Sequence, residues 1–277
     1  MSRPETRPET RPETRISRRF ESLRGLSRKG LIAYLTCGDP APGETAALVL
    51  EAEAAGADLI ELGVPWSDPS ADGPVIQRAM ERALAAGGSL RGALATVAEV
   101  RRRSEVPIVL FGYFNPILAR GIERVADEAA AAGADGLLVV DLPLEESAQL
   151  DGALRARGLD RVPLIAPTTP LDRAARIALA GSGFAYYVSL AGVTGAGHLD
   201  AAEVGLRTAA LRPALDGLPL AVGFGVKDAA SARALAPHAD AVVVGSAIVQ
   251  AIESGRDAAA RRHALAAIVR SLRAALD

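Results

Sequence analysis

The chain has 277 residues, of which 49% are hydrophobic and 23% are charged, with a formal net charge of -2. This balance gives no reason to expect nucleic acid or an anionic membrane as a partner. No uncharged apolar run approaches the roughly 18 residues that a membrane helix needs, and the Arg-rich start lacks the apolar core of a signal peptide. Cys37 is the single cysteine, so the chain cannot form an internal disulfide, as is typical of a cytoplasmic protein.

The first residues form a short tandem repeat. Arg-Pro-Glu-Thr occurs at 3–6, 7–10 and 11–14. A proline at every fourth position blocks helix and sheet, and the repeat offers nothing apolar to bury. We therefore predict a disordered tail over residues 1–15 and a single folded domain over residues 16–277.

Helix signals recur along the folded part. The spacing of Ile16, Phe20 and Leu23 predicts a short amphipathic helix that closes the bottom of a barrel. Ser89 and Pro170 are residue types that commonly stand where a helix begins. The phrase Ala-Ala-Gly-Ala-Asp occurs at 54–58 and again at 131–135, which predicts a helix that ends at glycine and a short loop into a strand.

After Gly30, short apolar runs alternate with Ala-rich helical stretches. The runs are apolar almost throughout, as expected of parallel strands covered on both faces. Predicted strands lie near 31–36, 58–62, 107–111, 136–140, 162–165, 184–188, 219–223 and 240–244. Predicted helices include 43–55, 73–86, 89–103, 121–132, 144–157, 170–180, 201–211, 227–236 and 257–275. Eight strands alternating with helices over about 245 residues are typical of a (β/α)₈ TIM barrel.

A doubly wound open sheet is the alternative architecture. It usually has fewer strands, and its dinucleotide-binding form carries Gly-x-Gly-x-x-Gly after the first strand. Here the first strand runs into Thr-Cys-Gly-Asp-Pro at 36–40, which is a different pattern and favours the barrel.

In a barrel of this kind the active site is built by the loops after the strands. Glu61 stands among apolar residues near the end of the second predicted strand. If it points inward, burial raises its pKa toward the acid–base range; an outward Glu61 paired with a helix cation is an equal alternative. Asp72, in the following loop, is by itself more readily explained as a helix cap, and Asp68 as a turn residue.

Glycine turns end the seventh and eighth predicted strands. The seventh runs into Gly-Phe-Gly at 223–225, and the eighth into Gly245-Ser246 at the start of a helix. Backbone N–H groups at such turns, backed by a helix N-terminus, bind anions. Because phosphate sites recur after strands 7 and 8 of this fold, we predict a phosphate site here. Glycines within 190–198 predict a lid that closes on the ligand.

Metal and lysine chemistry find no support. The three histidines and single cysteine show no metal-ligand spacing. The two lysines, Lys29 and Lys227, lie outside the predicted strands. A phosphosugar lyase on this chain would therefore work without a lysine imine.

The segment 61–74 closely resembles the signature of the tryptophan synthase α subunit family. Residues 36–40, 192–195, 223–225 and 245–247 resemble the family's other motifs, in the same order. The resemblance spans roughly residues 31–255 and implies a barrel lyase of tryptophan biosynthesis. Such an enzyme splits indole-3-glycerol phosphate into indole and glyceraldehyde 3-phosphate.

The resemblance also implies roles for individual residues. Glu61 becomes the catalytic acid–base and Asp72 the second essential carboxylate, in place of a helix cap. The residues expected to bind substrate are Tyr34, Phe111, Leu138, Tyr186, Thr194, Gly195, Phe224, Gly225, Gly245 and Ser246. Gly195, Gly225, Gly245 and Ser246 match phosphate contacts, Tyr186 an active-site tyrosine, and Thr194 a position in the closing lid.

Family membership implies a partner as well. A β subunit that carries pyridoxal phosphate receives indole through a tunnel, in an α₂β₂ heterotetramer. Asp68 and Pro69 match the contact with that subunit, and no cofactor is expected in this chain. Leu190 departs from the pattern, because many relatives carry an arginine at that lid position, and the N-terminal repeat lies outside the pattern.

Three alternatives stay open from the sequence. A stand-alone lyase that releases free indole would share all of these motifs. A non-catalytic barrel that only activates a partner would not need Glu61 and Asp72 together. A phosphosugar epimerase or isomerase would normally need metal-binding histidines or a different acid–base pair.

Overall fold

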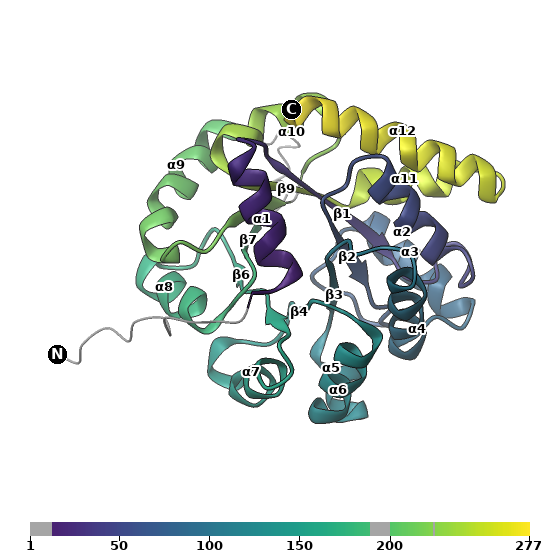
Figure 1. The fold of residues 1–277 in the computed structure, drawn as a ribbon, viewed down its shortest axis with the longest axis horizontal. Helices are drawn as coiled ribbons and strands as arrows, with labels where there is room; N and C mark the ends of the chain where they lie inside the picture. The colour runs from purple at the N-terminus through teal and green to yellow at the C-terminus, as the bar shows by residue number, and fades with distance from the viewer. Residues whose placement is uncertain (1–12, 189–199, 224) are drawn as a thin grey trace.

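The computed structural model describes residues 13–188, 200–223 and 225–277. Its parallel strands form a closed ring with helices around the outside (Figure 1). The strands are β1 (Gly30–Thr36), β2 (Leu59–Gly63), β3 (Ile108–Gly112), β4 (Gly136–Val139), β5 (Asp160–Arg161), β6 (Leu164–Ile165), β7 (Ala185–Val188), β8 (Leu220–Gly223) and β9 (Ala241–Val244). The (β/α)₈ barrel predicted from the sequence is confirmed.

Helices follow or precede every long strand, as the alternating pattern predicts. The α-helices are α1 (Arg15–Gly25), α2 (Thr45–Ala54), α3 (Pro74–Ala85), α4 (Leu90–Arg101), α5 (Phe114–Arg120), α6 (Ile122–Ala132), α7 (Ala148–Arg155), α8 (Leu171–Ala180), α9 (Ala201–Leu211), α10 (Ala229–Leu235), α11 (Ser246–Ser254) and α12 (Ala258–Leu276). Short 3-10 helices are η1 (Leu144–Glu146), η2 (Arg212–Leu215) and η3 (Ala236–His238). None of the described helices is both long and apolar enough to cross a membrane.

The fifth predicted strand, 162–165, differs from the prediction. It appears as two short pieces, β5 and β6, which pair with β4 and β7 respectively. Pro163 lies between them and has no N–H to donate to a ladder; its carbonyl accepts the N–H of Tyr186 at 2.8 Å. Because β5 and β6 stand at the two ends of the strand order, the segment 160–165 closes the barrel.

Helix boundaries follow local signals. Ser89 caps α4, accepting a hydrogen bond from the N–H of Gly92 at 3.3 Å, and Pro170 stands at the N-cap of α8. Gly133 ends α6 in the left-handed conformation. These three predictions are confirmed. Helix α5 was not predicted; its first N–H, on Phe114, donates to the Asp141 carboxylate at 2.7 Å.

The amphipathic helix at the N-terminus closes the bottom of the barrel, as predicted. Ile16, Phe20 and Leu23 are buried, and the Phe20 ring lies 5.7 Å from the ring of Phe184 inside the barrel. Figure 1 shows α1 lying across the ring of strands. The helix begins at Arg15, capped by Thr14; residues 1–12 of the predicted tail lie outside the described residues.

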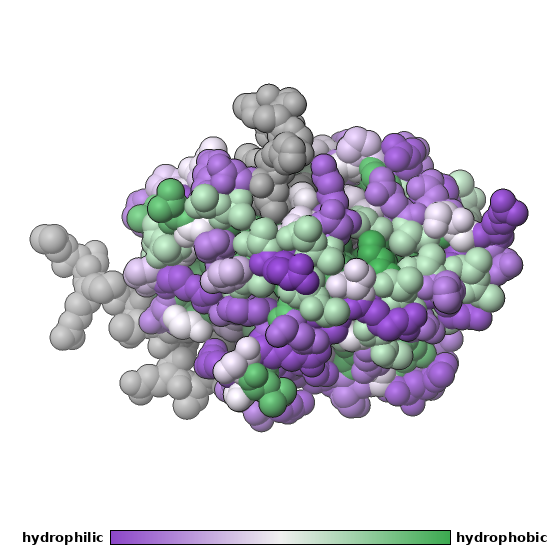
Figure 2. Space-filling model, turned by 90° about the horizontal axis from the view of Figure 1, so that it is seen from above, coloured by the Kyte–Doolittle hydropathy of each residue, from purple (hydrophilic) through white to green (hydrophobic). Residues whose placement is uncertain are grey.

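Side chains alternate across the barrel wall. On β1, Ile32 and Tyr34 point into the barrel, while Leu31, Ala33 and Leu35 pack under the helices. The outer surface of the helix ring mixes hydrophilic and hydrophobic residues, as the face in Figure 2 shows. The exposed large hydrophobic side chains among the described residues are scattered over separate elements; they are Leu26, Leu118, Leu171 and Leu206.

Three aspartates fasten neighbouring strands together at the bottom of the barrel. Each stands just before a strand, and its carboxylate accepts an N–H from the start of the adjacent strand. The pairs are Asp58 with Leu31 (2.9 Å), Asp135 with Ile108 (2.7 Å) and Asp240 with Leu220 (2.7 Å). Two of these aspartates end the repeated Ala-Ala-Gly-Ala-Asp phrase, so the repeat places a carboxylate where a strand amide needs an acceptor.

Arginines neutralise the two of these carboxylates that are buried, those of Asp58 and Asp135. The Asp58 carboxylate contacts Arg273 at 2.9 Å and Arg19 at 3.9 Å. Asp135 contacts Arg101 at 3.0 Å and Arg15 at 3.1 Å. Since Arg15 and Arg19 both belong to α1, the ion pairs fix this helix to the end of the barrel.

We expect Asp58→Ala to destabilise the chain by about 3–5 kcal/mol, because the buried Arg273 would lose its buried partner and keep only the half-exposed Asp277, at 3.0 Å. The N–H of Leu31 would lose its acceptor as well. Urea denaturation followed by circular dichroism measures the change. Asp127→Ala, which removes an exposed pair with Arg157, is the control and should have little effect. A loss below about 1 kcal/mol for Asp58→Ala, the range of an exposed pair, would contradict the assignment.

Candidate active site

Glu61 lies inside the barrel. On β2 its neighbours Ile60 and Leu62 face the helices, so alternation turns Glu61 inward. In the sheet register it stands between Tyr34 of β1 and Val109 of β3, both of which are inward-facing. The inward alternative from the sequence is therefore the one the structure adopts.

The environment of Glu61 favours its protonated form. The residue is 0% exposed, and neither carboxylate oxygen has a hydrogen-bond partner among the described residues. Burial raises the pKa of this carboxyl to about 8, because the charged form loses its hydration without compensation. At neutral pH Glu61 therefore holds a proton that it can deliver.

Two buried tyrosines share the space around Glu61. Burial raises the pKa of Tyr34 and of Tyr186 well above the usual value, and the charges of Glu61 and Asp72 raise both further. Glycines on the adjacent strands make room for the rings. A Cβ on Gly63 would lie 2.2 Å from the Tyr34 hydroxyl, and one on Gly223 would lie 2.1 Å from the Tyr186 hydroxyl. A side chain at Gly63 would therefore displace the Tyr34 phenol, and a side chain at Gly223 would displace the Tyr186 phenol.

An apolar wall lies beside these polar groups. The rings of Tyr34 and Phe111 meet edge to face, with centroids 5.4 Å apart. Leu138 pairs with Phe111 across β3 and β4 and is fully buried. The structure therefore brings Tyr34, Phe111, Leu138 and Tyr186 together in one inner cluster; the predicted Phe224 lies outside the described residues.

Asp72 lies in the loop after β2. It is 8% exposed, and its carboxylate accepts a hydrogen bond from the Tyr113 hydroxyl at 2.7 Å. Helix α3 begins with Gly73 at the N-cap and no side-chain cap bond, so Asp72 does not cap this helix. Burial raises the Asp72 pKa to about 6, against the lowering effect of the Tyr113 hydrogen bond. This carboxyl is therefore mostly ionised at neutral pH.

The same loop carries Asp68 and Pro69. Asp68 is exposed and Pro69 half-buried. Their carbonyl groups accept hydrogen bonds from Ser70 at 2.9 Å and from Asp72 at 3.0 Å. These turns present Asp68 to solvent while Asp72 points inward. The turn interpretation of Asp68 is confirmed, and its contact with a partner stays a prediction.

The predicted phosphate end borders the same mouth. Gly245 stands at the N-cap of α11 and Ser246 is its first residue. A Cβ on Gly245 would lie 3.4 Å from Ile76 and 3.6 Å from Tyr34, which places this turn beside the inner cluster. Gly225 has a φ of 79°, the left-handed conformation of a tight turn. Thr194 and Gly195, predicted to close over this end, lie outside the described residues.

Among the described residues, no group of three or more His, Cys, Asp and Glu side chains is arranged to hold a metal ion. His238 lies in η3 and His263 in α12, away from the mouth; His198 lies outside the described residues. Lys29 donates to the carbonyl of Ala239 at 2.8 Å, at the bottom of the barrel. The polar groups described above for the inner cluster and the loop after β2 include the carboxyl groups of Glu61 and Asp72 and the phenols of Tyr34 and Tyr186.

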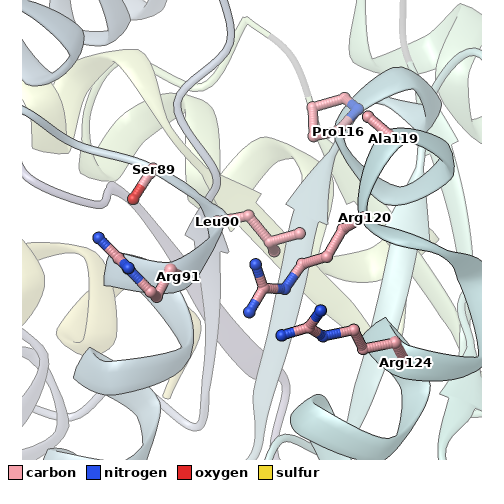
Figure 3. Close-up of a pocket in the computed structure, with 7 residues that line it drawn as sticks. All are labelled: Ser89, Leu90, Arg91, Pro116, Ala119, Arg120 and Arg124. Carbon is pink, nitrogen blue, oxygen red and sulfur yellow. The ribbon is translucent and has the colours of Figure 1, made fainter.

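A surface cavity of about 500 Å³ lies outside the barrel, between the start of α4 and helices α5 and α6. Figure 3 shows the guanidinium groups of Arg120 and Arg124 near each other on the side of Leu90, while that of Arg91 extends away from them. Arg120 and Arg124 share the carboxylate of Glu128, at 2.8 and 2.9 Å. The cavity contains none of the predicted site residues, so the inner cluster and the loop after β2 remain the candidate active site.

One residue of the site was not predicted. Tyr113 stands directly after β3 and hydrogen bonds to Asp72. Its place at the end of a predicted strand, on the catalytic face, was the available signal. Tyr113 and Asp72 are 41 residues apart in the sequence, so no local pattern predicts that they pair.

The fold and the site together define a (β/α)₈-barrel enzyme with two buried carboxyl groups, Glu61 and Asp72, in its candidate active site. The sequence profile of the family described as tryptophan synthase alpha chain matches residues 20–276. The tryptophan synthase alpha chain of Chromobacterium violaceum is 54% identical over 262 residues, which cover 94% of this chain and 98% of the relative. That of Nitrosococcus oceani is 51% identical over 264 residues, covering 95% and 97%.

Solved structures agree. The crystal structure of tryptophan synthase subunit alpha from Legionella pneumophila superposes with a TM-score of 0.88 at 40% identity, covering 96% of this chain and 99% of that one. The chain belongs to the tryptophan synthase alpha chain family. It is a lyase of tryptophan biosynthesis, as the resemblance of its motifs predicts.

Replacing Glu61 by Gln should change how stability depends on pH. The Glu61 carboxyl titrates near 8 when folded and near about 4.3 when unfolded. Between these values the folded state keeps a proton that the unfolded state has released. The free energy of unfolding therefore falls as pH rises, by at most about 1.4 kcal/mol per pH unit from this group.

Urea denaturation of both proteins from about pH 5 to pH 8 tests this, since the glutamine variant lacks the titrating group. Its stability should fall less steeply over that range than that of the unmodified chain. The comparison cancels every other titrating group. Identical slopes would mean that the Glu61 carboxyl is not desolvated.

Proposed function

We propose that Glu61 is the acid–base of indole-3-glycerol phosphate cleavage and that Asp72 accepts the hydrogen bond of the indole N–H. The observation that carries this is the separation of the two pKa values. At neutral pH Glu61, with a pKa of about 8, is protonated, whereas Asp72, with a pKa of about 6, is ionised. Two carboxyl groups in one site that titrate apart are suited to separate roles.

The reaction needs both states at once. Glu61 delivers its proton to C3 of the indole ring, which becomes an electron-poor indolenine. Positive charge develops at the ring nitrogen, and the Asp72 carboxylate stabilises it there. The Glu61 carboxylate then takes the proton of the glycerol hydroxyl as the bond from C3 to the glycerol carbon breaks. The electron pair returns to the ring, indole and glyceraldehyde 3-phosphate leave, and Glu61 is protonated again.

The inner cluster is suited to an aromatic ring. We place the indole against Tyr34, Phe111, Leu138 and Tyr186, with Phe224 as a further predicted contact. Edge-to-face packing of the kind that Tyr34 and Phe111 already make favours another ring beside them. Since Glu61 lies in the register between Tyr34 and Val109, a ring held there has its reacting carbon near the acid.

The phosphate group belongs at the turns after β8 and β9. We assign its contacts to Gly225, Gly245 and Ser246, with Gly195 and the lid residue Thr194 completing the enclosure. The free N–H groups at the start of a helix such as α11 carry a partial positive charge. That Gly245 also borders Tyr34 supports one ligand that spans both ends of the mouth.

We further propose a partner that receives the indole. The relatives are named as alpha chains or subunits, and the exposed Asp68 beside Pro69 supports a contact at the mouth. The partner is a tryptophan synthase β subunit with pyridoxal phosphate, in an α₂β₂ heterotetramer in the cytoplasm. This chain then needs no cofactor of its own.

Glu61→Gln should lower the rate of indole formation by roughly 100- to 10,000-fold, the usual contribution of a general acid–base. Asp72→Asn should cost roughly 100- to 1,000-fold, because the charge that stabilises the indolenine is lost. Indole release from indole-3-glycerol phosphate, measured alone and with a saturating β subunit, gives both values.

Glu99→Gln, which makes the same chemical change on the exposed face of α4, is the control and should keep full activity. Binding of glycerol 3-phosphate by calorimetry should be nearly unchanged in Glu61→Gln, because the phosphate end is separate. Undiminished turnover by Glu61→Gln would defeat the assignment and leave the non-catalytic alternative.

A β subunit should strongly activate the cleavage and elute with this chain as one complex in size-exclusion chromatography. Asp68→Ala should weaken that activation while leaving the turnover of the isolated chain unchanged, since the side chain faces solvent. Full activity of the isolated chain without any response to the β subunit would favour the stand-alone lyase.

A further inference from the structure

Tyr113 joins the ends of two neighbouring strands. It follows β3 directly and stands at the N-cap of α5, where it is 3% exposed. Its hydroxyl reaches the loop after β2, where it accepts the N–H of Ala71 at 3.0 Å and donates to Oδ2 of Asp72 at 2.7 Å. A single phenol oxygen thus fastens both the backbone and the carboxylate of this loop.

We propose that Tyr113 is a positioning residue for the cleavage reaction, holding the Asp72 carboxylate ionised and oriented toward the ring nitrogen of the substrate. The inference rests on the role proposed for Asp72. Tyr113 itself does not touch the reacting atoms.

The hydrogen-bond chain gives this carboxylate a direction. The order Ala71 N–H, Tyr113 O–H, Asp72 carboxylate places a donor and an acceptor on the same phenol, and such chains strengthen each bond. With Oδ2 occupied, Oδ1 is the oxygen available to the indole N–H. The side chain of Asp72 is thereby fixed before the substrate arrives, which lowers the reorganisation that catalysis requires.

Tyr113 remains a donor throughout the working pH range. Burial raises its pKa above the usual value, and the hydrogen bond and charge of Asp72 raise it further. Its hydrogen bond in turn lowers the pKa of Asp72 against the larger effect of burial. Glu61 has no hydrogen-bond donor of this kind among the described residues. The pKa of Glu61 is accordingly higher, about 8 against about 6 for Asp72.

Other groups around Asp72 do not replace Tyr113. The charge of Asp72 raises the pKa of Tyr34 on β1 and of Tyr186 on β7. The charge of Glu61, on β2, raises the pKa of the same two tyrosines. The charge of Asp141, which follows β4, raises the pKa of Tyr113. The Asp141 carboxylate also accepts a hydrogen bond from the N–H of Phe114 at 2.7 Å. That contact anchors the backbone next to Tyr113, so three successive strand ends support the position of one carboxylate.

Tyr113→Phe removes the hydroxyl and keeps the ring. We expect kcat to fall roughly 10- to 100-fold, the effect of losing a hydrogen bond to a charged group. The acid limb of the pH profile of kcat should move upward by about one unit or more, because Asp72 loses the donor that favours its ionised form. The profile is measured as the pH dependence of indole formation from indole-3-glycerol phosphate, with each variant in complex with the β subunit.

Tyr187→Phe is the matched control. Tyr187 is a buried tyrosine on β7 that packs on the helix side of the barrel wall, so its hydroxyl lies outside the site. This variant should keep both kcat and the pH profile. Circular dichroism and binding of glycerol 3-phosphate show whether Tyr113→Phe keeps the fold and the phosphate end.

Carbon-13 NMR of labelled aspartate provides a measurement independent of turnover. The Asp72 carboxyl should titrate at higher pH in Tyr113→Phe than in the unmodified chain. An unchanged Asp72 titration, or an acid limb that coincides with that of the unmodified enzyme, would overturn the inference. If Asp72→Asn itself keeps full activity, the proposed function fails first. Loss in Asp72→Asn with an unchanged Tyr113→Phe profile defeats only the role of Tyr113.

Discussion

The site depends on the cost of burying a carboxyl group in hydrocarbon. Glu61 lies inside the barrel without a hydrogen-bond partner among the described residues, where an ionised carboxylate is strongly disfavoured. The side chain therefore retains its proton at neutral pH. A protein selected only for stability would place an apolar residue there, and a functional site is where such local violations are expected. The group proposed as the catalytic acid is therefore the same group that carries this cost of burial.

The buried carboxyl groups at the mouth lie at the opposite end of the barrel from the ion pairs that stabilise it. At the bottom, buried aspartates accept strand N–H groups and pair with arginines from α1, α4 and α12. At the mouth, the corresponding carboxylates of Glu61 and Asp72 have no cationic partner in the described hydrogen bonds. Carboxyl groups therefore support stability at one end of the strands and are the proposed catalytic groups at the other, in keeping with the division between the two faces of this fold.

Much of this arrangement could be predicted from the sequence. The alternation of apolar runs with helical stretches predicts the barrel, and the spacing of Ile16, Phe20 and Leu23 predicts the covering helix α1. The sequence left the inward and outward orientations of the Glu61 side chain as equal alternatives. The register that places it between Tyr34 and Val109 depends on strand pairing. Asp72 was assigned by family resemblance, since a carboxylate before Gly-Pro is by itself more readily explained as a helix cap.

Other features depend on contacts that no local pattern contains. The pairing of Tyr113 with Asp72 joins two loops, and the split of the fifth strand at Pro163 depends on which neighbours it meets. Helix α5 is short, and its first N–H is satisfied by Asp141 from a later loop. The lid and Phe224 lie outside the described residues, so Thr194, Gly195 and Phe224 remain predictions.

The aspartates at the bottom bear on how the chain reaches this barrel. Asp58 and Asp135 each accept an amide 27 residues earlier, and Asp240 one 20 residues earlier. Each therefore closes one strand–helix–strand unit, at a chain-entropy cost that depends only weakly on length. Units closed by local contacts assemble faster than distant pairings. The pairing of β1 with β9 joins strands from opposite ends of the chain and is a contact of long range.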